Sequence, residues 1–333
     1  MAGAVAGGAE TPTEGPGEFT TRASSINRAL DQIGDKWCLL IIQEVLWGIN
    51  SFNEMMEAMG VSRGVLSNRL KWLQEVDCLR REPSAADSRR PRYHLTRKSV
   101  DLYDSALMAV TWERSWYQTP ELDRVELVHL NCGSPFAPQM RCGACDRLVV
   151  SEDASFTPGP GATRDVREKK VRRRSSISIE EIPSRRALYK NLINVVGDRW
   201  TSNVIALAFH GLTRFDQFHS ELPVATNILS DRLRFLVEEG IFEQVAYRQR
   251  PLRHEYHLTE KGRGLFPWFL TLLQWGDRWC DPEGRGPPMR VIHTPCGQPL
   301  RAEVRCNRCD GVLHAHEVSF TLGDEDATRP PRL

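Results

Sequence analysis

The sequence predicts a mainly α-helical fold with small β-hairpins (α+β), built as two tandem copies of one domain, each followed by a small cysteine-containing module. Two observations support this prediction. An amphipathic segment at residues 61–73 returns at 224–236, with leucines at positions i, i+4 and i+7 forming an apolar stripe in each copy. Paired cysteines recur at one spacing after each copy, at residues 132–145 and 296–309.

The internal repeat is carried by three short motifs, each of which returns 163 positions later. The paired motifs are Gly34-Asp-Lys-Trp37 with Gly197-Asp-Arg-Trp200, Ser67-Asn-Arg-Leu70 with Ser230-Asp-Arg-Leu233, and Tyr93-His-Leu-Thr96 with Tyr256-His-Leu-Thr259. This period is far longer than that of solenoid repeats, so each copy should fold as a unit. A chain of 333 residues is long enough to build both cores.

Composition and charge restrict the class of protein. A formal net charge of +1 excludes a globally basic coat for nucleic acid, so any nucleic-acid surface must be local. No segment approaches the ~18 apolar residues of a membrane span, and the N-terminus lacks a secretory signal, so a cytoplasmic protein without membrane contact is expected. Nine cysteines, six of them clustered, favour metal ligation in a reducing compartment over disulfides.

The chain divides by composition into tails, domains, modules and a linker. Residues 1–21 are Ala-, Gly-, Thr-, Pro- and Glu-rich, with little to bury, and should be disordered. Residues 151–184 are expected to be a flexible linker, whose basic run is either a solvated segment or an arm that contacts phosphates. The remaining predicted divisions are repeat domains at 22–120 and 185–280, cysteine modules at 121–150 and 281–322, and a tail at 323–333.

Four helices open each copy. In copy one, residues 26–34 and 37–47 should form the first two helices, the second of them buried. Ser51 and Glu54 form a capping box for a short third helix that ends at Gly60. The amphipathic segment begins after this tight turn, which is a helix-turn-helix arrangement. The corresponding cap and turn residues of copy two are Thr213, Asp216 and Pro223.

A β-hairpin with an arginine-rich tip follows, with strands expected at 78–82 and 92–95 in copy one. Alone, such a run is typical of a solvated loop, but directly after a helix-turn-helix it is typical of a wing that contacts phosphates. A closing helix is expected at 96–117, and again at 259–279. Its apolar stripe either packs within its own domain or forms a dimer interface.

The outward face of each amphipathic segment carries short hydrogen-bonding side chains near the helix start and basic residues one turn later. This pattern suits a helix end in a DNA major groove, although many amphipathic helices merely cover a core. We predict base-edge contacts from Arg63, Ser67, Asn68, Thr226, Asn227 and Ser230. We predict phosphate contacts from Arg69, Lys71, Arg89, Arg90, Arg92, Arg232, Arg234, Arg248, Arg250 and Arg253.

Each cysteine module contains His-x-x-Cys and Cys-x-x-Cys, with nine residues between the two pairs. One nitrogen and three sulfurs suit tetrahedral zinc, and four protein ligands leave no position open for catalysis. We therefore predict two structural zinc sites, the alternative being surface histidines and free thiols. The two predicted ligand sets are His129, Cys132, Cys142 and Cys145, and His293, Cys296, Cys306 and Cys309. Outside these sets, we expect Cys38, Cys78 and Cys280 to be buried and His314 and His316 to lie on the surface.

The order of these elements, with Gly-Asp-Lys/Arg-Trp, Ser-x-Arg-Leu-x-x-Leu and Tyr-His-Leu-Thr-x-Lys/Arg, resembles the HxlR-type family of winged helix-turn-helix bacterial transcription regulators over residues 22–117 and 185–280. The resemblance implies DNA binding by a two-fold arrangement of two winged domains. Many members form homodimers of one-domain chains, whereas here one chain could supply both halves. Thiol-sensing members carry a reactive cysteine where this chain has Ser24 and Ala187, so redox sensing there is not expected.

We therefore predict a non-enzymatic, sequence-specific DNA-binding transcription regulator. Its predicted partners are double-stranded DNA and the other half of an intramolecular pseudo-dimer or homodimer, with a small-molecule effector as a further candidate. Because Asp231 replaces Asn68 and most outward positions differ, we expect unequal half-sites and weaker binding by copy two. The alternatives are a protein-interaction scaffold that has lost DNA binding and a zinc-dependent enzyme, although the sequence carries no catalytic triad or His-Glu-x-x-His motif.

Overall fold

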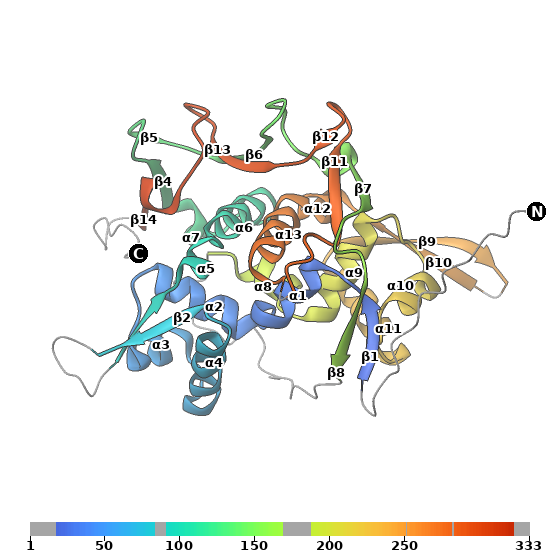
Figure 1. The fold of residues 1–333 in the computed structure, drawn as a ribbon, viewed down its shortest axis with the longest axis horizontal. Helices are drawn as coiled ribbons and strands as arrows, with labels where there is room; N and C mark the ends of the chain where they lie inside the picture. The colour runs from blue at the N-terminus through green and yellow to red at the C-terminus, as the bar shows by residue number, and fades with distance from the viewer. Residues whose placement is uncertain (1–17, 84–90, 169–187, 251, 282, 323–333) are drawn as a thin grey trace, which may run out of the picture.

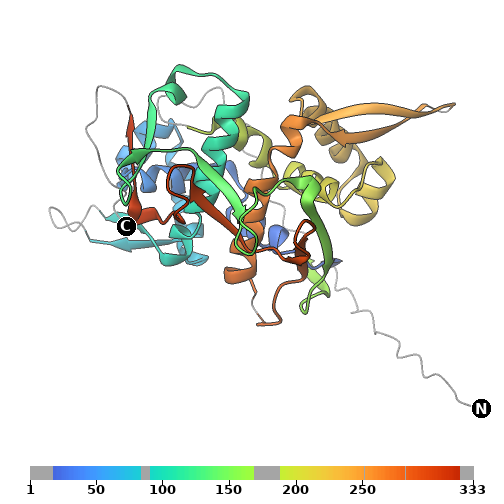
Figure 2. The same ribbon diagram turned by 90° about the horizontal axis from the view of Figure 1, so that it is seen from above.

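The computed structural model confirms two tandem domains of mainly helical structure with small β-hairpins. In Figure 1 a layer of short strands lies at the top, the long closing helices of both repeats lie beneath it, and one helix-turn-helix unit lies toward each side. Seen from above, the hairpin of the second repeat extends far from the body (Figure 2). The structure describes residues 18–83, 91–168, 188–250, 252–281 and 283–322.

The first repeat opens with the four expected helices. They are α1 (Ser25–Ile33), α2 (Lys36–Leu46), α3 (Phe52–Met59) and α4 (Arg63–Glu75). Side chains cap each start: Asp35 accepts a hydrogen bond from the backbone N–H of Trp37, and Ser51 from that of Glu54. Gly60 ends α3 in the left-handed conformation, at φ 61°, which produces the tight turn before α4.

The wing and the closing helix of the first repeat follow, with one difference from the expected pattern. The elements are β2 (Leu79–Glu82), β3 (Arg92–Leu95), α5 (Arg97–Val100) and α6 (Tyr103–Trp116). The expected single closing helix is therefore broken into α5 and α6. Thr96 caps the short first piece by accepting a hydrogen bond from the N–H of Ser99, and the chain then turns before α6 begins.

The second repeat has the same order of elements. They are α8 (Lys190–Val196), α9 (Arg199–Phe209), α10 (Phe215–Glu221), α11 (Thr226–Glu238), β9 (Phe242–Gln249), β10 (Leu252–Leu258), α12 (Glu260–Arg263) and α13 (Phe266–Trp279). The expected cap of α10 by Thr213 and Asp216 is wrong. Instead, the Gln217 side-chain oxygen accepts from the N–H groups of Thr213 and Arg214, both at 3.0 Å. The start of α10 is thus capped by the side-chain amide of Gln217, from the first turn of the helix, and not by the hydroxyl of Thr213, which precedes the helix.

Short strands form the rest of the structure. They are β1 (Glu18–Arg22), β4 (Val125–His129), β5 (Ser134–Pro135), β6 (Pro138–Cys142), β7 (Ala154–Pro158), β8 (Arg164–Glu168), β11 (Met289–His293), β12 (Gln298–Pro299), β13 (Ala302–Cys306) and β14 (Val318–Leu322). The short helix α7 (Pro120–Asp123) and the 3₁₀ segments Ser151–Asp153 and Ala315–Glu317 connect them. Residues 151–168 are therefore not the expected linker, because β7 pairs with β11 and β8 pairs with β1. The expected disordered tail at 1–21 is wrong for residues 18–21, which form part of β1.

The two repeats pack on each other through their closing helices. Helix α13 lies against α1 and α6, and α6 also lies against α8. The indole N–H of Trp112 donates to the carbonyl of Lys261 at 3.0 Å, and that of Trp275 donates to the carbonyl of Lys98 at 2.7 Å. Trp112 and Trp275 are equivalent positions of the two repeats, and so are Lys98 and Lys261. Such reciprocal contacts define a pseudo-two-fold interface, so the closing helices join the repeats rather than serving only their own domains.

The strand layer obeys the same symmetry. Strand β4 pairs with β14, β11 pairs with β7, and β6 pairs with β13, so all three ladders join one repeat to the other. In the central ladder Met140 pairs with Val304, and these are equivalent positions, 164 residues apart. The pseudo-two-fold axis therefore passes between them. The cysteine modules are consequently interlocked rather than folded one per repeat.

Three cysteines outside the modules lie in the core, as expected. Cys38 and Cys78 are fully buried, and Cys280 is nearly so. Burial raises the pKa of Cys78 to about 11 and that of Cys280 to about 12, because an apolar environment disfavours the thiolate. These thiols are therefore poor nucleophiles. Among the described residues, no helix is both long and apolar enough to cross a lipid bilayer.

Candidate DNA-binding surfaces and metal centres

Helix α4 presents its predicted contact residues to solvent. Leu66, Leu70 and Leu73 are buried, which leaves Arg63, Ser67 and Asn68 among the exposed positions of the other face. The Ser62 side chain caps the helix by accepting from the N–H of Val65. The Arg63 guanidinium lies 5.3 Å from the centre of the Phe52 ring, at the start of the preceding helix. This contact holds the guanidinium of Arg63 beside the exposed N-terminus of α4.

Helix α11 is arranged in the same way but carries different chemistry. Thr226, Asn227 and Ser230 are exposed, and a buried leucine stripe again faces the core. The N-cap is Ala225, which provides no side-chain cap. Asp231 forms an exposed ion pair with Arg234 at 3.4 Å. The second surface therefore contains an acidic group where the first has an amide.

Two arginines predicted to contact phosphate are partly buried in ion pairs within their own domains. Arg69 donates twice to the carboxylate of Asp35, at 2.8 and 2.9 Å. Arg232 makes the equivalent two bonds to Asp198, at 2.9 and 2.8 Å. Each aspartate also caps the second helix of its repeat. Each pair thus links a recognition helix to the helix behind it and directs the guanidinium toward a carboxylate of its own domain.

The wings differ in what they leave exposed. Arg92 is bonded to the side chains of Asn50, at 2.8 Å, and Glu54, at 3.2 Å, and 40% of its side chain remains exposed. Exposed Lys71 lies 3.7 Å from Glu75. Arg248, Arg250 and Arg253 are exposed on the longer second wing, and Arg89 and Arg90 fall outside the described residues.

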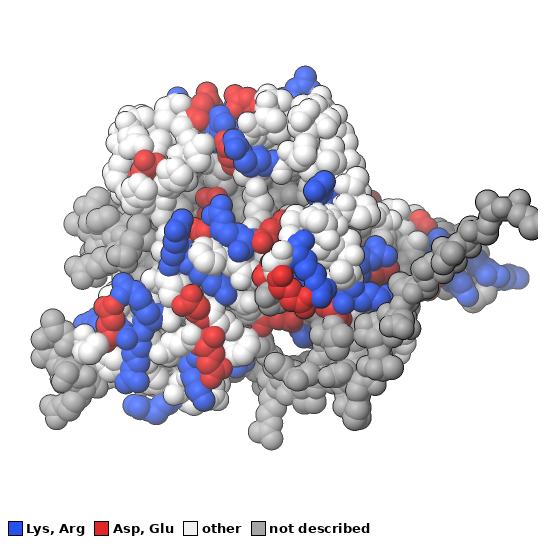
Figure 3. Space-filling model, in the orientation of Figure 1, with Lys and Arg blue, Asp and Glu red and all other residues white. Residues whose placement is uncertain are grey.

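Basic and acidic side chains are mixed on this face of the molecule. Figure 3 shows Lys and Arg at the lower left, over the first winged domain, across the middle of the face, and at the far right, where the second wing ends. Acidic side chains lie between and among them. This distribution agrees with a net charge of only +1.

The eight predicted metal ligands form two clusters, but not in the predicted combination. The first cluster contains His129, Cys132, Cys306 and Cys309, and the second contains Cys142, Cys145, His293 and Cys296. Each takes its His-x-x-Cys from one repeat and its Cys-x-x-Cys from the other. The within-repeat grouping was wrong because β6 pairs with β13, so each Cys-x-x-Cys turn projects toward the partner module. Sequence spacing is the same for both arrangements.

The dimensions of both clusters fit a tetrahedral ion. In each cluster one candidate ligand atom from every residue lies within 4.8 Å of the others. His129 Nδ1 lies 3.5 Å from Cys132 Sγ and 3.2 Å from Cys309 Sγ. Zinc with bonds of about 2.0–2.3 Å places its ligand atoms about 3.5–3.8 Å apart. The two Cys/His clusters could therefore bind metal ions, with the His rings buried and Nδ1 facing the thiols.

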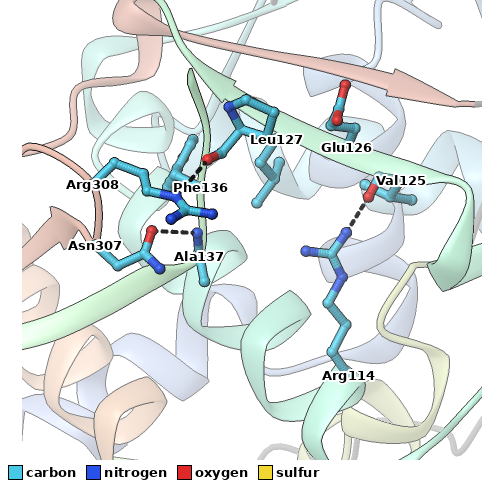
Figure 4. A pocket seen from close by; sticks show the side chains of 9 residues that line it. Arg114, Val125, Glu126, Leu127, Phe136, Ala137, Asn307 and Arg308 are labelled. Carbon is cyan, nitrogen blue, oxygen red and sulfur yellow. Dashed lines mark hydrogen bonds between the residues drawn. The ribbon is translucent and has the colours of Figure 1, made fainter. Parts of the chain in front are cut away.

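A hollow of about 310 Å³ lies beside the first cluster and is lined by residues of both repeats. In Figure 4 Arg114 and Arg308 point into it from different repeats. The Arg308 guanidinium donates to the carbonyl of Pro135 at 3.3 Å, and the N–H of Ala137 donates to the Asn307 side chain at 2.9 Å. The Cys-x-x-Cys turn of repeat two is thus bonded to the β5–β6 connection of repeat one.

Two exposed helix-turn-helix units, each with a β-hairpin wing, define the class of winged helix-turn-helix proteins. Within that class, the family model for HxlR-like helix-turn-helix matches residues 32–121 and again 195–284. The chain belongs to this family, as a tandem duplication. The resemblance drawn from the sequence motifs is thereby confirmed.

Relatives of the chain are named as transcription regulators. The uncharacterized HTH-type transcriptional regulator Rv3095 of Mycobacterium tuberculosis is 41% identical over 127 residues, which is 38% of this chain and 80% of the relative. YvaP of Bacillus subtilis, of the same description, is 30% identical over 95 residues, 28% of this chain and 88% of the relative. The crystal structure of PA1607, a proposed transcription factor, shares 35% identity over 44% of this chain and 96% of its own, with a TM-score of 0.36.

Proposed function

We propose that this chain is a sequence-specific DNA-binding transcription regulator in which both winged domains of one molecule contact one duplex. Family membership and the regulator relatives support DNA binding. The observation that supports sequence-specific recognition of DNA is the exposed polar face of α4, which lies directly beside a tight turn and a wing. The pseudo-two-fold interface lets a single chain supply the two halves that a homodimer would otherwise provide.

We assign base-edge contacts to Arg63, Ser67 and Asn68 in the first half, because these side chains are exposed near the start of a recognition helix. In the second half the corresponding group is Thr226, Asn227 and Ser230. Phosphate contacts then fall to the more exposed cations, and we drop Arg69 and Arg232, whose side chains are partly buried in doubly bonded ion pairs. The remaining described candidates are Lys71, Arg92, Arg234, Arg248, Arg250 and Arg253.

Zinc is the metal that we propose for both clusters. Three thiolates and one imidazole favour zinc over harder cations such as magnesium or calcium. Four protein ligands complete a tetrahedral shell, so the ion would hold the strand layer together and would leave no position for a reacting water. The role is structural, and no catalysis is assigned to either cluster.

The test is selection of bound duplexes from a randomised library, followed by titration of the best duplex against its scrambled version over a range of salt concentrations. A preference of at least about 10³-fold, with affinity falling steeply as salt rises, is expected for specific recognition. Two unequal half-sites should emerge from the selection. A symmetric inverted repeat would contradict the half-site prediction, and absence of binding even at low salt would favour a protein-interaction scaffold.

Two single variants separate the proposed roles. Arg63→Ala should relax the preference at one base position, whereas Arg253→Ala should weaken binding to all duplexes alike and lower the salt slope by about one. Both side chains are exposed, so neither change should affect folding. Identical effects of the two variants on specificity and salt slope would show that the roles are wrongly assigned.

A further inference from the structure

We infer that each metal ion is shared between the repeats and cross-links them. This inference rests on the proposed metal binding but not on DNA recognition. Each cluster combines a His-x-x-Cys pair from one repeat with a Cys-x-x-Cys pair from the other. Removal of either repeat's pair would leave two ligands, too few to complete a tetrahedral zinc shell.

The strand ladders explain why the pairs cross over. Strands β6 and β13 are antiparallel, with Cys142 opposite Ala302 and Cys306 opposite Pro138. The two cysteines therefore lie at opposite ends of a five-residue ladder, separated by about 13 Å of strand. At each end, the Cys-x-x-Cys turn of one repeat lies over the partner's module.

The strands that carry the two histidines are also paired with strands of the opposite repeat. His129 ends β4 and pairs with Val318 of β14, while His293 ends β11 and pairs with Ala154 of β7. Both partner strands belong to the opposite repeat. Each His-x-x-Cys pair is thus held by backbone bonds to the repeat that donates the two remaining ligands.

Three interatomic distances cross directly between the repeats. Cys309 Sγ lies 3.2 Å from His129 Nδ1, and Cys145 Sγ lies 3.3 Å from His293 Nδ1. Cys142 Sγ lies 4.0 Å from Cys296 Sγ. All are close to the ligand separations of about 3.5–3.8 Å around tetrahedral zinc.

Shared ligation couples metal affinity to the pairing of the repeats. Because a complete shell exists only when the modules interlock, metal binding stabilises that pairing, and the pairing raises metal affinity by the same factor. The strand layer rests on the closing helices, on the side away from α4 (Figure 1). The ions would therefore fix the arrangement of the two winged domains without contacting DNA.

Two double variants of the full chain, each lacking two thiols, distinguish shared from within-repeat ligation. Cys132→Ser with Cys309→Ser removes two ligands from the first cluster and none from the second. Cys132→Ser with Cys145→Ser removes one ligand from each cluster, although both residues belong to repeat one. Zinc per chain is measured by native mass spectrometry after challenge with a chelator that leaves two ions on the unaltered protein.

Shared ligation predicts that the Cys132/Cys309 variant retains one zinc ion and the Cys132/Cys145 variant retains none under the same challenge. Ligation within each repeat predicts the reverse, since it leaves one complete site in the Cys132/Cys145 variant. Circular dichroism of both variants should show unchanged helix content, because none of the three substituted cysteines lies in a helix. The reverse result overturns the inference.

Disulfide mapping of the unaltered, metal-free chain gives a second test that needs no variant. Mild oxidation should join Cys132 to Cys306 or Cys309, and Cys296 to Cys142 or Cys145. Bonds from Cys132 to Cys142 or Cys145 would overturn the inference. If the unaltered chain binds no zinc, the proposed metal fails, but the mapped bonds still report whether the modules interlock.

Discussion

The two repeats are most alike where they hold the fold and least alike where they face solvent. The ion pair between Arg69 and Asp35 is reproduced by Arg232 and Asp198, with the same atoms in contact. On the recognition helices, by contrast, Asn68 is replaced by Asp231. A shared framework therefore presents two different surfaces, which is the arrangement that unequal DNA half-sites require.

The junction between the repeats also departs from symmetry at one pair of equivalent positions. Glu113 of α6 is buried, and its carboxylate accepts from the N–H groups of Asn191 and Leu192 at the start of α8, both at 3.0 Å. Its equivalent in α13 is Gly276, which lets α1 approach closely. One side of the junction is thus a buried capping interaction, and the other is a close contact between helices. Because the two sides differ, each repeat fits the other better than a second copy of itself.

The largest expected effect follows from breaking these two contacts. Glu113→Ala would leave one buried and one partly buried N–H group at the start of α8 without acceptors and should lower the free energy of unfolding by about 3 kcal/mol. Gly276→Ala should cost about 2 kcal/mol, because the new Cβ would lie 2.3 Å from the carbonyl oxygen of Ser25 and α1 must shift. Urea denaturation measures both. Exposed Glu238→Ala is the control, and equal effects of control and test variants would show that the junction is not specific.

Next in size is the framework pair that the repeats share. Asp35→Ala and Asp198→Ala each remove a helix cap and a charged partner of a half-buried arginine, so each should cost about 2 kcal/mol. Exposed Glu57→Ala should change stability by less than about 0.5 kcal/mol. Denaturation midpoints that fall in only one of the two variants would contradict equal roles in the two repeats.

Sequence patterns could predict the recognition helices, wings and ligand residues because each rests on local spacing. Leu66, Leu70 and Leu73 fix which face of α4 is buried, and the stripe returns in α11. Similarly, His-x-x-Cys and Cys-x-x-Cys identify ligands whatever their partners. The wing of the first repeat begins within one residue of its expected start.

Pairing between distant segments could not be predicted in the same way. Two modules with the same spacing allow within-repeat and shared ligation equally, and only the β6–β13 ladder distinguishes them. Likewise, Arg69 and Arg232 were assigned to phosphates because a linear sequence shows charge but not the nearby Asp35 or Asp198. A signal for these two pairs did exist, since Gly-Asp-Lys/Arg-Trp places an aspartate before a helix in both repeats.

Exchange of the divergent outward residue gives the third effect in size. Asp231→Asn removes a carboxylate from the surface that we propose faces DNA and should raise affinity about five-fold, or about 1 kcal/mol. Asn68→Asp should lower affinity by a similar factor through charge repulsion. Loss of the proposed contact between the Asn68 amide and a base should lower affinity further. Fluorescence anisotropy with the selected duplex at fixed salt measures both. Unchanged affinity of the Asp231→Asn variant would mean that the second helix does not approach DNA.

The smallest effect concerns the starts of the two recognition helices. Ser62 caps α4 with its hydroxyl, whereas Ala225 leaves α11 without a side-chain cap. Ser62→Ala should therefore lower the free energy of unfolding by about 1 kcal/mol, and Ala225→Ser should raise it by about 0.5–1 kcal/mol. Because the backbone at Ala225 is already extended, at φ −62° and ψ 144°, serine can cap there without rearrangement. Opposite signs in thermal denaturation are expected, and a stability loss in both variants would show that the α11 start is held by something other than its cap.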